Sequence, residues 1–433
     1  MVAVERLIQA HQAFAANGAS GAPAWLKELR DDGIARFGAL GFPTTKQEAW
    51  RFTSVAAIAE TTFELAHPAS RIPSLDAIQP FLLGDGPLLV FVNGFLQRSL
   101  STPLLDGIRL DGLAQTLVDA PDLVRPHLGK YAAFADRPFA ALNTAFVHDG
   151  AFVHVPARTV FEQPIQLLFL AVPTGTAPLV SHPRNLIVVE REGRASVVET
   201  YVALSEGVYW TNAVTEVVAG DGARVDCYRV QREGNRAFHV AVTDVHQGRD
   251  SIANVHAVSF GAALARHDLR GTLGGPGGCL ILNGLYALTG DQHADHHTAI
   301  DHAAPHCESH EYFNGVLDDR SRGVFNGRII VRPGAQKTDS KQTNNNLLLS
   351  RDAHADSQPQ LEIYADDVKC THGSTVGPLD PRALFYLRSR GVGEHEARRL
   401  LTYGFAAEIL GRMDVASLRA QLDAIVRGRL AEP

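Results

Sequence analysis

The chain has 433 residues, of which 45% are hydrophobic and 20% charged, and its 47 acidic and 40 basic side chains give a formal charge of -7. This composition excludes an intrinsically disordered chain and a collagen, and the length predicts two or three domains or one elongated repeat body. Acidic and basic residues are interspersed, which argues against nucleic acid or an anionic membrane as the main partner.

Residues 1–150 are predicted to form a helical or mixed N-terminal domain. Apolar side chains recur at helical spacing from Val4 to Phe14 and from Trp25 to Phe37. A strand-like apolar run follows at 88–95, and a further helix is expected over 131–146. The N-terminus is too polar for a signal peptide, and no apolar run reaches the roughly 20 residues of a membrane-spanning helix. We therefore expect a cytoplasmic protein.

Residues 151–378 are predicted to form a parallel β-helix. Short β-branched runs alternate here with Gly, Asp and Asn turns, without helical periodicity, at 185–189, 195–202, 213–218 and 224–230. The stretch is about twice as long as one β-sandwich needs. A β-helix accommodates this length because its coils, each with a few short strands, stack around a narrow core.

Residues 379–433 are predicted to form a C-terminal helical domain. Asp380 is a favourable N-cap before Pro381, Gly391 ends the first helix, and two more helices are expected over 394–411 and 415–430. The last coil of a β-helix exposes apolar core and free strand edges. We therefore expect this domain to cover the open end.

Histidines are concentrated in residues 293–310, where six occur in eighteen positions. On a strand His293, Asp295 and His297 share one face, and imidazole with carboxylate suits zinc or iron(II). The alternative is that buried His and Asp side chains form structural hydrogen bonds between coils, and His302 is expected to be internal. Both interpretations stay open.

A run of three asparagines at 344–346 is predicted to be architectural, because asparagines occupy turns and stack as amide ladders between coils. Nothing matches the phosphate-binding pattern GxxxxGK[ST], so we do not expect the chain itself to hydrolyse a nucleotide.

Cys370 and His372 form the second candidate site. The four cysteines lie far apart without a CxxC pair, so neither a disulfide framework nor a zinc finger is predicted. Two residues apart on a strand, Cys370 and His372 point the same way and could present a thiolate and an imidazole to iron or a cluster. Two donors cannot close a site, so the remaining ligands would come from sulfide, water, another coil or a partner. The alternative is that both are structural.

Several motifs together resemble the SufD family of iron–sulfur cluster assembly proteins: QEAWRFT at 47–53, KTDSKQTNNNLLLS at 337–350, PQLEIYADDVKCTHGSTVG at 359–377, LFYLRSRGV at 384–392 and YGFAAEIL at 403–410. The sister family SufB carries Glu-His-Glu before its final helices. This chain has Thr371-His372-Gly373 after Cys370, which resembles SufD.

The resemblance implies a mainly β fold, a right-handed parallel β-helix flanked by N- and C-terminal helical domains. It implies a non-catalytic scaffold subunit that pairs with SufB through the β-helix edge and binds the ATPase SufC through the C-terminal helices. The expected SufC contacts are Phe385, Tyr386, Leu387, Arg388, Tyr403 and Phe405.

His372 matches the functional histidine of the SufD family at the SufB interface. The resemblance implies that His372, with Cys370 as second donor, holds iron or a transient iron–sulfur cluster there, and that the isolated chain binds none tightly. Flavin involvement and a homodimer in the absence of SufB stay open.

Two other functions are weighed. One is a cytosolic metal-binding protein with His293 and His297 as ligands. The other is a β-helix carbohydrate-active enzyme that uses carboxylate pairs such as Asp318-Asp319 or Asp366-Asp367, although such enzymes are typically secreted.

Overall fold

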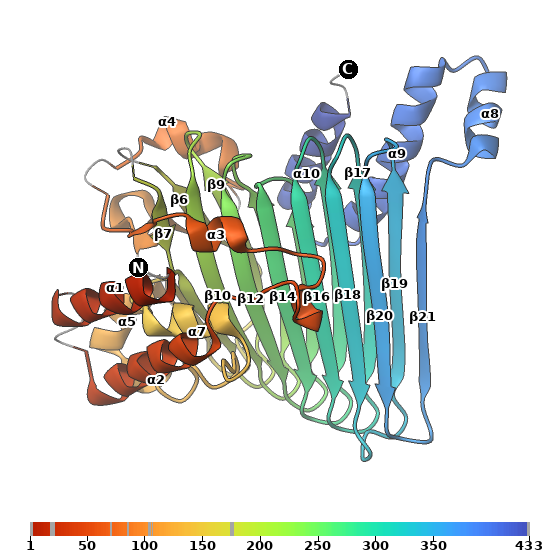
Figure 1. Cartoon of the computed structure of the whole chain (residues 1–433). Helices are drawn as coiled ribbons and strands as arrows, with labels where there is room; N and C mark the ends of the chain where they lie inside the picture. The colour runs from red at the N-terminus through yellow and green to blue at the C-terminus, as the bar shows by residue number, and fades with distance from the viewer. Residues whose placement is uncertain are drawn as a thin grey trace.

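The computed structural model describes residues 3–17, 22–69, 72–84, 86–102, 105, 107–173 and 177–430. Two sheets of mostly parallel strands face each other, and helices gather around the first coils and beside the last ones (Figure 1). The predicted parallel β-helix with flanking helices is confirmed.

The strands divide between a first and a second sheet. The path through the first sheet runs through β20 (His354–Ile363), β18 (Arg322–Val331), β16 (His293–His302), β14 (Leu264–Leu273), β12 (Phe238–Gln247), β10 (Tyr209–Ala219), β8 (Arg184–Val189), β5 (Ala151–Val155) and β4 (Arg109–Gly112), with β7 (Leu179–Ser181) and β1 (Glu64–Leu65) beside β10. The second sheet runs through β21 (Lys369–Gly377), β19 (Asp339–Leu348), β17 (Glu308–Leu317), β15 (Cys279–Leu288), β13 (Ile252–Ser259), β11 (Arg224–Arg232), β9 (Arg194–Ala203), β6 (Ile165–Ala171), β2 (Leu88–Val92) and β3 (Phe95–Leu96).

Each later coil contributes one long strand to each sheet. Leu264 pairs with His293 and His293 pairs with Arg322, a spacing of 29 residues in each step. These strands contain 10 residues, so the expectation of a few short strands in every coil is wrong for this part of the chain. The alternation of side chains along a strand places one set between the sheets and the other outside.

Polar side chains between the sheets are paired across coils. Asn344 Nδ2 donates to Tyr286 Oη at 3.1 Å, and the Tyr286 hydroxyl donates to Asn346 Oδ1 at 2.5 Å. His302 is buried, with Nε2 2.9 Å from Ser309 Oγ. The architectural role predicted for the asparagine run and the internal position predicted for His302 are both confirmed.

The N-terminal part contains α1 (Ala3–Asn17), α2 (Ala24–Leu40), η1 (Glu48–Trp50), α3 (Ala56–Glu60), α4 (Leu75–Ile78), η2 (Gln79–Phe81), η3 (Arg98–Leu100), α5 (Leu113–Asp119), α6 (Pro121–Val124) and α7 (Pro138–Ala145). The two helices predicted first correspond to α1 and α2, and Gly41, with φ 64°, is the C-cap of α2. The helix expected over 131–146 starts only at Pro138, because proline favours the first position of a helix and keeps the preceding Arg137 extended. None of the helices in the described ranges is long and apolar enough to cross a membrane.

Three helices follow the last strand: α8 (Pro381–Ser389), α9 (Glu394–Leu410) and α10 (Ala416–Arg429). Asp380 Oδ1 accepts a hydrogen bond from the Arg382 N–H at 2.9 Å, as its predicted N-cap role requires. The expectation that this domain covers the open end is wrong. Apolar side chains of α9 and α10, such as Ile409 and Leu422, pack instead on the outer face of the second sheet against Tyr228 and Leu285.

Candidate functional site at the open end of the solenoid

The last coil leaves a free strand edge. In the described part of the chain the backbone of β21 pairs with β19 alone, and that of β20 with β18 alone (Figure 1). Lys369 N–H donates to Thr338 O at 2.8 Å, and backbone groups of a parallel strand alternate between its two sides. The N–H groups of Cys370, His372 and Val376 therefore face the free edge, which is a template for a further strand.

Cys370 and His372 lie on the face of β21 that points between the two sheets. His372 is in register with Gln342, which is buried between the sheets, and Ser374 on the same face donates to Ser357 Oγ of β20 at 2.8 Å. His372 is exposed and Cys370 is half-buried. The structure thus places both predicted donors side by side at the mouth of the solenoid.

These two donors form an incomplete ligand set. Burial, together with the Asp339 carboxylate, raises the pKa of the Cys370 thiol, so a metal ion would have to displace its proton. Among the described residues no three His, Cys, Asp or Glu side chains are placed to hold one metal ion. An iron or cluster site with about four ligands therefore needs donors from another molecule.

A buried polar pair lies beneath His372. Glu311, Gln342 and His372 occupy one register position on three successive strands of the second sheet. Gln342 Nε2 donates to Glu311 Oε2 at 2.6 Å, and burial raises the pKa of Glu311 to about 7. No sequence motif marked this pair, although Gln342 alternates with Asn344 and Asn346 and so shares their inward face.

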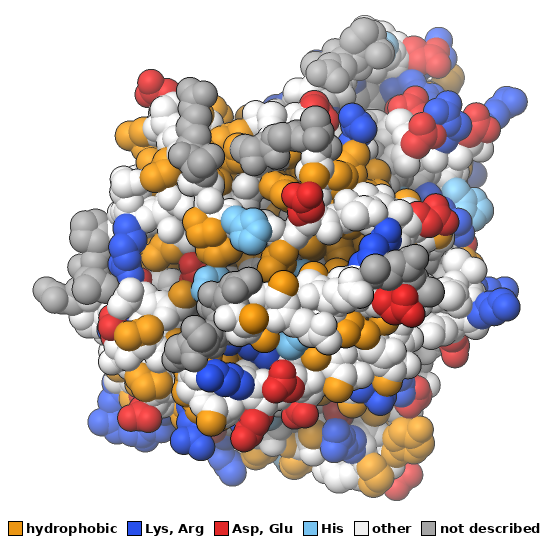
Figure 2. All heavy atoms as spheres, turned by 60° about the vertical axis from the view of Figure 1, so that its left-hand side comes forward, with side chains coloured by type: hydrophobic (Ala, Val, Ile, Leu, Met, Phe, Trp, Pro, Cys, Tyr) orange, Lys and Arg blue, Asp and Glu red, His pale blue; other side chains and the backbone are white. Residues whose placement is uncertain are grey.

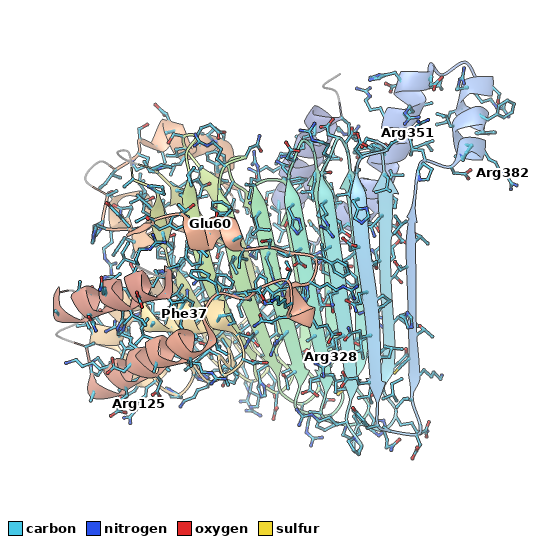
Figure 3. All side chains as sticks on the ribbon, viewed as in Figure 1. Phe37, Glu60, Arg125, Arg328, Arg351 and Arg382 are labelled. Atoms are coloured by element: carbon cyan, nitrogen blue, oxygen red, sulfur yellow. The ribbon has the colours of Figure 1, made fainter. Side chains whose placement is uncertain are left out.

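The helix α8 presents exposed aromatic side chains. Phe385 and Tyr386 are 73% and 58% exposed, Arg388 is also exposed, and Leu387 is half-buried. Figure 3 places Arg382 on α8, which projects away from both sheets. This part of the expected partner-binding set lies on an accessible surface.

Tyr403 and Phe405 on α9 are instead engaged within the chain. The Tyr403 hydroxyl donates to Asp423 of α10, and the Arg427 guanidinium lies 3.9 Å from the Tyr403 ring centroid. The carbonyl of Phe405 accepts a hydrogen bond from Asn314 at 2.9 Å. Tyr403 thus attaches α9 to α10, and Phe405 attaches it to β17.

Within the histidine-rich segment, His293, Asp295 and His297 lie on the outer face of β16. Asp295 accepts hydrogen bonds from Thr53 at 2.5 Å and Arg266 at 2.7 Å, and His297 Nε2 is 3.1 Å from its other oxygen. Burial alone would raise the pKa of Asp295, but Arg266 and His297 hold it well below its usual range. His293 Nε2 lies 2.9 Å from Thr53 Oγ1. These contacts support the structural interpretation, and metal binding by His293 and His297 stays a prediction.

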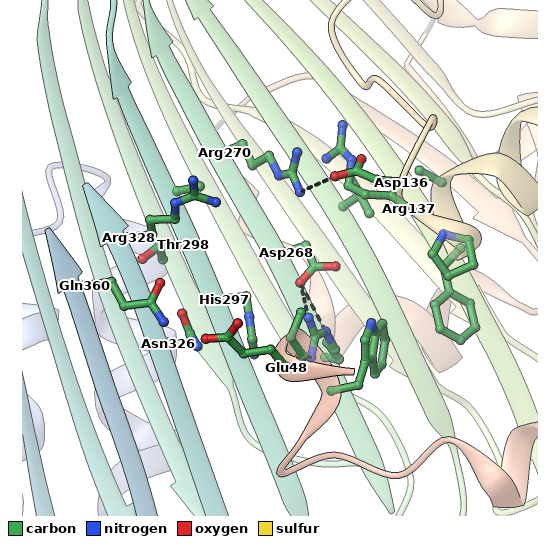
Figure 4. Close-up of a pocket in the computed structure, with 18 of the residues that line it drawn as sticks. Glu48, Asp136, Arg137, Asp268, Arg270, His297, Thr298, Asn326, Arg328 and Gln360 are labelled. Atoms are coloured by element: carbon green, nitrogen blue, oxygen red, sulfur yellow. Dashed lines mark hydrogen bonds and ion pairs between the residues drawn. The ribbon is translucent and has the colours of Figure 1, made fainter. Parts of the chain in front are cut away.

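The same contacts attach the 47–53 motif to the first sheet. Arg266 stacks on Trp50, with its guanidinium carbon 3.7 Å from the ring centroid, and donates to the Ala49 carbonyl at 2.7 Å. A groove of about 670 Å³ runs beside this segment (Figure 4). The lining contains basic side chains, such as Arg270 and Arg328, and acidic ones, such as Asp136. The groove therefore favours no single class of ligand.

Comparison with known proteins identifies the family. Residues 172–405 match the family model described as SUF system FeS cluster assembly, SufBD core domain, and residues 1–167 match the SufBD protein N-terminal region. The chain belongs to the SufBD family of iron–sulfur cluster assembly proteins.

Two of the similar proteins carry the name SufD. The iron–sulfur cluster assembly protein SufD of Escherichia coli is 30% identical, over 98% of this chain and 96% of the relative. SufD of Bacillus subtilis is 29% identical over 94% of each chain, and a SufBD family protein of Synechocystis is 34% identical over 89% of this chain and 87% of its own. The SufD resemblance predicted from the motifs is confirmed.

Proposed function

We propose that this protein is a non-catalytic scaffold subunit for iron–sulfur cluster assembly. It pairs with a SufB-like subunit at the free edge of β21, contributes His372 to a site shared across that interface, and binds a SufC-like ATPase through α8. The observation that carries the proposal is the open end, where a free strand edge and the donors Cys370 and His372 occur together.

The β21 edge is better suited to strand pairing than the β20 edge. Tyr364 N–H donates to Val331 O at 2.9 Å, so alternate residues of β20 bond back to β18 and those between them face outward. Pro359 occupies one outward position and has no N–H to offer, whereas β21 contains no proline. Of these two edges, β21 therefore offers a partner strand an uninterrupted row of donors and β20 does not.

The shared site would hold iron or a nascent cluster as cargo. His372 supplies an imidazole nitrogen, and Cys370 supplies a thiolate once its proton is displaced. Because the remaining ligands come from the partner and from sulfide, the site is complete only while the subunits are paired. An assembly scaffold needs such a site, since it must release the cluster that it builds.

Anaerobic co-expression of the full chain with SufB-like and SufC-like proteins tests the assembly, with the mass of the purified complex as readout. We expect a three-component complex. Val376→Pro removes an outward N–H without removing a bond to β19, and should abolish pairing with the SufB-like subunit while retaining SufC. Val376→Thr keeps the N–H and should pair normally. A wild-type chain found only as a monomer or a homodimer would refute the proposal.

The donor role of His372 is tested in the intact complex. We expect His372→Ala to assemble normally but to lose most of its iron and acid-labile sulfide after reconstitution. His354→Ala, which changes another exposed histidine on β20, is the matched control and should retain both. Unchanged iron and sulfide in His372→Ala would exclude this histidine as a donor.

The ATPase surface is tested by the double substitution Phe385→Ser and Tyr386→Ser. It removes two exposed rings from α8 and should abolish SufC binding while SufB pairing persists. Tyr364→Ser, which removes a ring that is 61% exposed outside α8, is the control. Retained SufC binding by the double variant would contradict the assignment of α8.

A further inference from the structure

A column of polar side chains lies between the sheets directly beneath His372. Charged side chains cover much of the surface, as Figure 2 shows for the side of the molecule away from the open end. Glu311 and Gln342, by contrast, are 2% and 1% exposed, and they share the register position of His372 on β17 and β19. The next residue down the column is the buried Leu282 of β15. The column is therefore polar only in the two coils beneath His372.

The amide of Gln342 has a defined direction. Its nitrogen Nε2 donates to Glu311 Oε2 at 2.6 Å, toward β17. Because the C–N and C=O bonds of an amide diverge, the oxygen Oε1 is directed away from β17 and toward β21, where His372 occupies the same register position. Neighbouring strands lie roughly 4.8 Å apart, which brings in-register side chains on one face into contact. His372 is therefore the side chain that stacks on this oxygen.

The Oε1 atom of Gln342 lacks a hydrogen-bond donor. It is buried, and none of the described residues donates to it. The amide oxygens that follow on the same inward face are both paired: Asn344 Oδ1 accepts from Asn346 Nδ2 at 2.8 Å, and Asn346 Oδ1 accepts from Tyr286 Oη at 2.5 Å. A buried acceptor without a partner is unfavourable. Because water does not reach Gln342 Oε1, only a side chain packed on it can supply the missing hydrogen bond.

The opposite wall offers no donor side chain at this level. Gly327 of β18 faces Gln342, since a Cβ atom on Gly327 would clash with Gln342 Nε2. Pro359 follows Gly327 in register on β20, and so lies across the mouth of the solenoid from His372. Glycine and proline have no hydrogen-bonding side chain, and proline lacks a backbone N–H as well. Of the residues at this level, His372 is therefore the one whose side chain can donate to Gln342 Oε1.

We propose that Gln342 is a positioning residue for His372. The exposed imidazole turns inward, one ring N–H donates to Gln342 Oε1, and the other ring nitrogen keeps its lone pair and faces the open end. Histidine ligands of metal ions are commonly oriented in this way, by an acceptor for the N–H of their second nitrogen. The hydrogen bond is a property of the free chain, whereas its consequence for iron rests on the function proposed above.

NMR of the full chain with isotope-labelled histidine, without partners or metal, tests the hydrogen bond. We expect one ring N–H signal that exchanges slowly with water and that disappears in His372→Ala. Gln342→Met fills a similar volume without an amide and should lose the slow exchange. Asn346→Leu removes another buried amide of β19, which lies beneath Val376, and should retain the signal.

Two results would refute the hydrogen bond. One is a wild-type spectrum without a slowly exchanging ring N–H that belongs to His372. The other is a signal that survives in Gln342→Met. The comparison of the wild type with His372→Ala decides the first point even if Gln342→Met does not fold.

The positioning role is tested by titrating the complex with SufB-like and SufC-like proteins with ferrous iron. Gln342→Met should need about 10–100 times more iron for half-saturation than the wild type, the usual effect of removing such an acceptor. Asn346→Leu should match the wild type. Equal iron requirements for Gln342→Met and the wild type would overturn the positioning role. A wild-type complex that binds no iron would refute the shared site itself, whereas the hydrogen bond is decided by the NMR of the free chain.

Discussion

Individual polar side chains set the chemistry between the sheets. Glu311 is buried, and its hydrogen bond from Gln342 does not fully offset the loss of water around a carboxylate. The pKa of Glu311 therefore rises from 4.5 to about 7. The folded protein binds this proton more tightly than the unfolded chain does, so the contribution of Glu311 to stability decreases as pH rises through this interval.

The pH dependence of stability is the first prediction. The contribution of Glu311 to the free energy of unfolding should be fully favourable below pH 4.5 and decrease by about 3 kcal/mol as pH rises past 7. Glu311→Gln removes this titration, so the variant should gain stability relative to wild type between pH 5 and pH 8, measured by denaturant unfolding. Glu308→Gln, at an exposed position on the same strand, should follow the wild type. If the stability of Glu311→Gln depended on pH as that of the wild type does, the raised pKa assigned to Glu311 would be contradicted.

At the scale of elements, the N-terminal helices depend on one close approach. A Cβ atom on Gly33 of α2 would lie 2.7 Å from the Ala145 nitrogen and 2.9 Å from the Ala141 oxygen, both backbone atoms of α7. Backbone cannot yield as a flexible side chain can. The absence of a side chain at this position therefore lets α2 and α7 touch.

The second prediction compares two glycines of α2. Gly33→Ala should reduce the free energy of unfolding by about 1–3 kcal/mol, because the added methyl group forces the helices apart. Gly38→Ala should instead raise it by about 0.5–1 kcal/mol, because its Cβ would meet only Ile8 Cδ1 at 3.5 Å and alanine favours a helix. Thermal and denaturant unfolding of both variants measure the difference. Equal effects would show that the contact with α7 is not tight.

The whole molecule is asymmetric along its long axis. Helices surround the first coils, while the last coil is left open (Figure 1). The apolar faces of α9 and α10 cover Val198, Tyr228, Val258, Phe260 and Leu285 on the second sheet. The C-terminal helices therefore belong to the packing of the solenoid as well as to a proposed binding surface.

The third prediction concerns truncation after Leu379. Removing all three helices should uncover the apolar face of the second sheet and cause association, because large exposed apolar patches promote aggregation. Light scattering and binding of a hydrophobic dye measure the effect. The double substitution of Phe385 and Tyr386 by serine should stay monodisperse. A monodisperse truncated chain that binds no dye would show that this packing is dispensable.

Local patterns predicted much of the molecule. The spacing of apolar residues indicated α1 and α2, Asp380 and Gly391 marked the first C-terminal helix, and the alternation of strand residues placed Cys370 and His372 on one face. These features depend on residues a few positions apart, whose geometry is set by the backbone of a helix or a strand. The family motifs then identified the SufD resemblance.

Contacts between distant segments were beyond the reach of such patterns. The alternation of side chains along a strand predicted that His293, Asp295 and His297 share one face. Their partner Thr53, however, lies about 240 residues earlier in the chain. The apolar stripe of α9 and α10 was visible in the sequence, but whether it would cover the end of the solenoid or its side depended on an apolar patch spread over several strands of the second sheet. An apolar stripe on a helix specifies only that this surface must be buried, and the assembled sheet decides where it is buried. Because α9 and α10 pack on the side of the second sheet, the open end with His372 stays free.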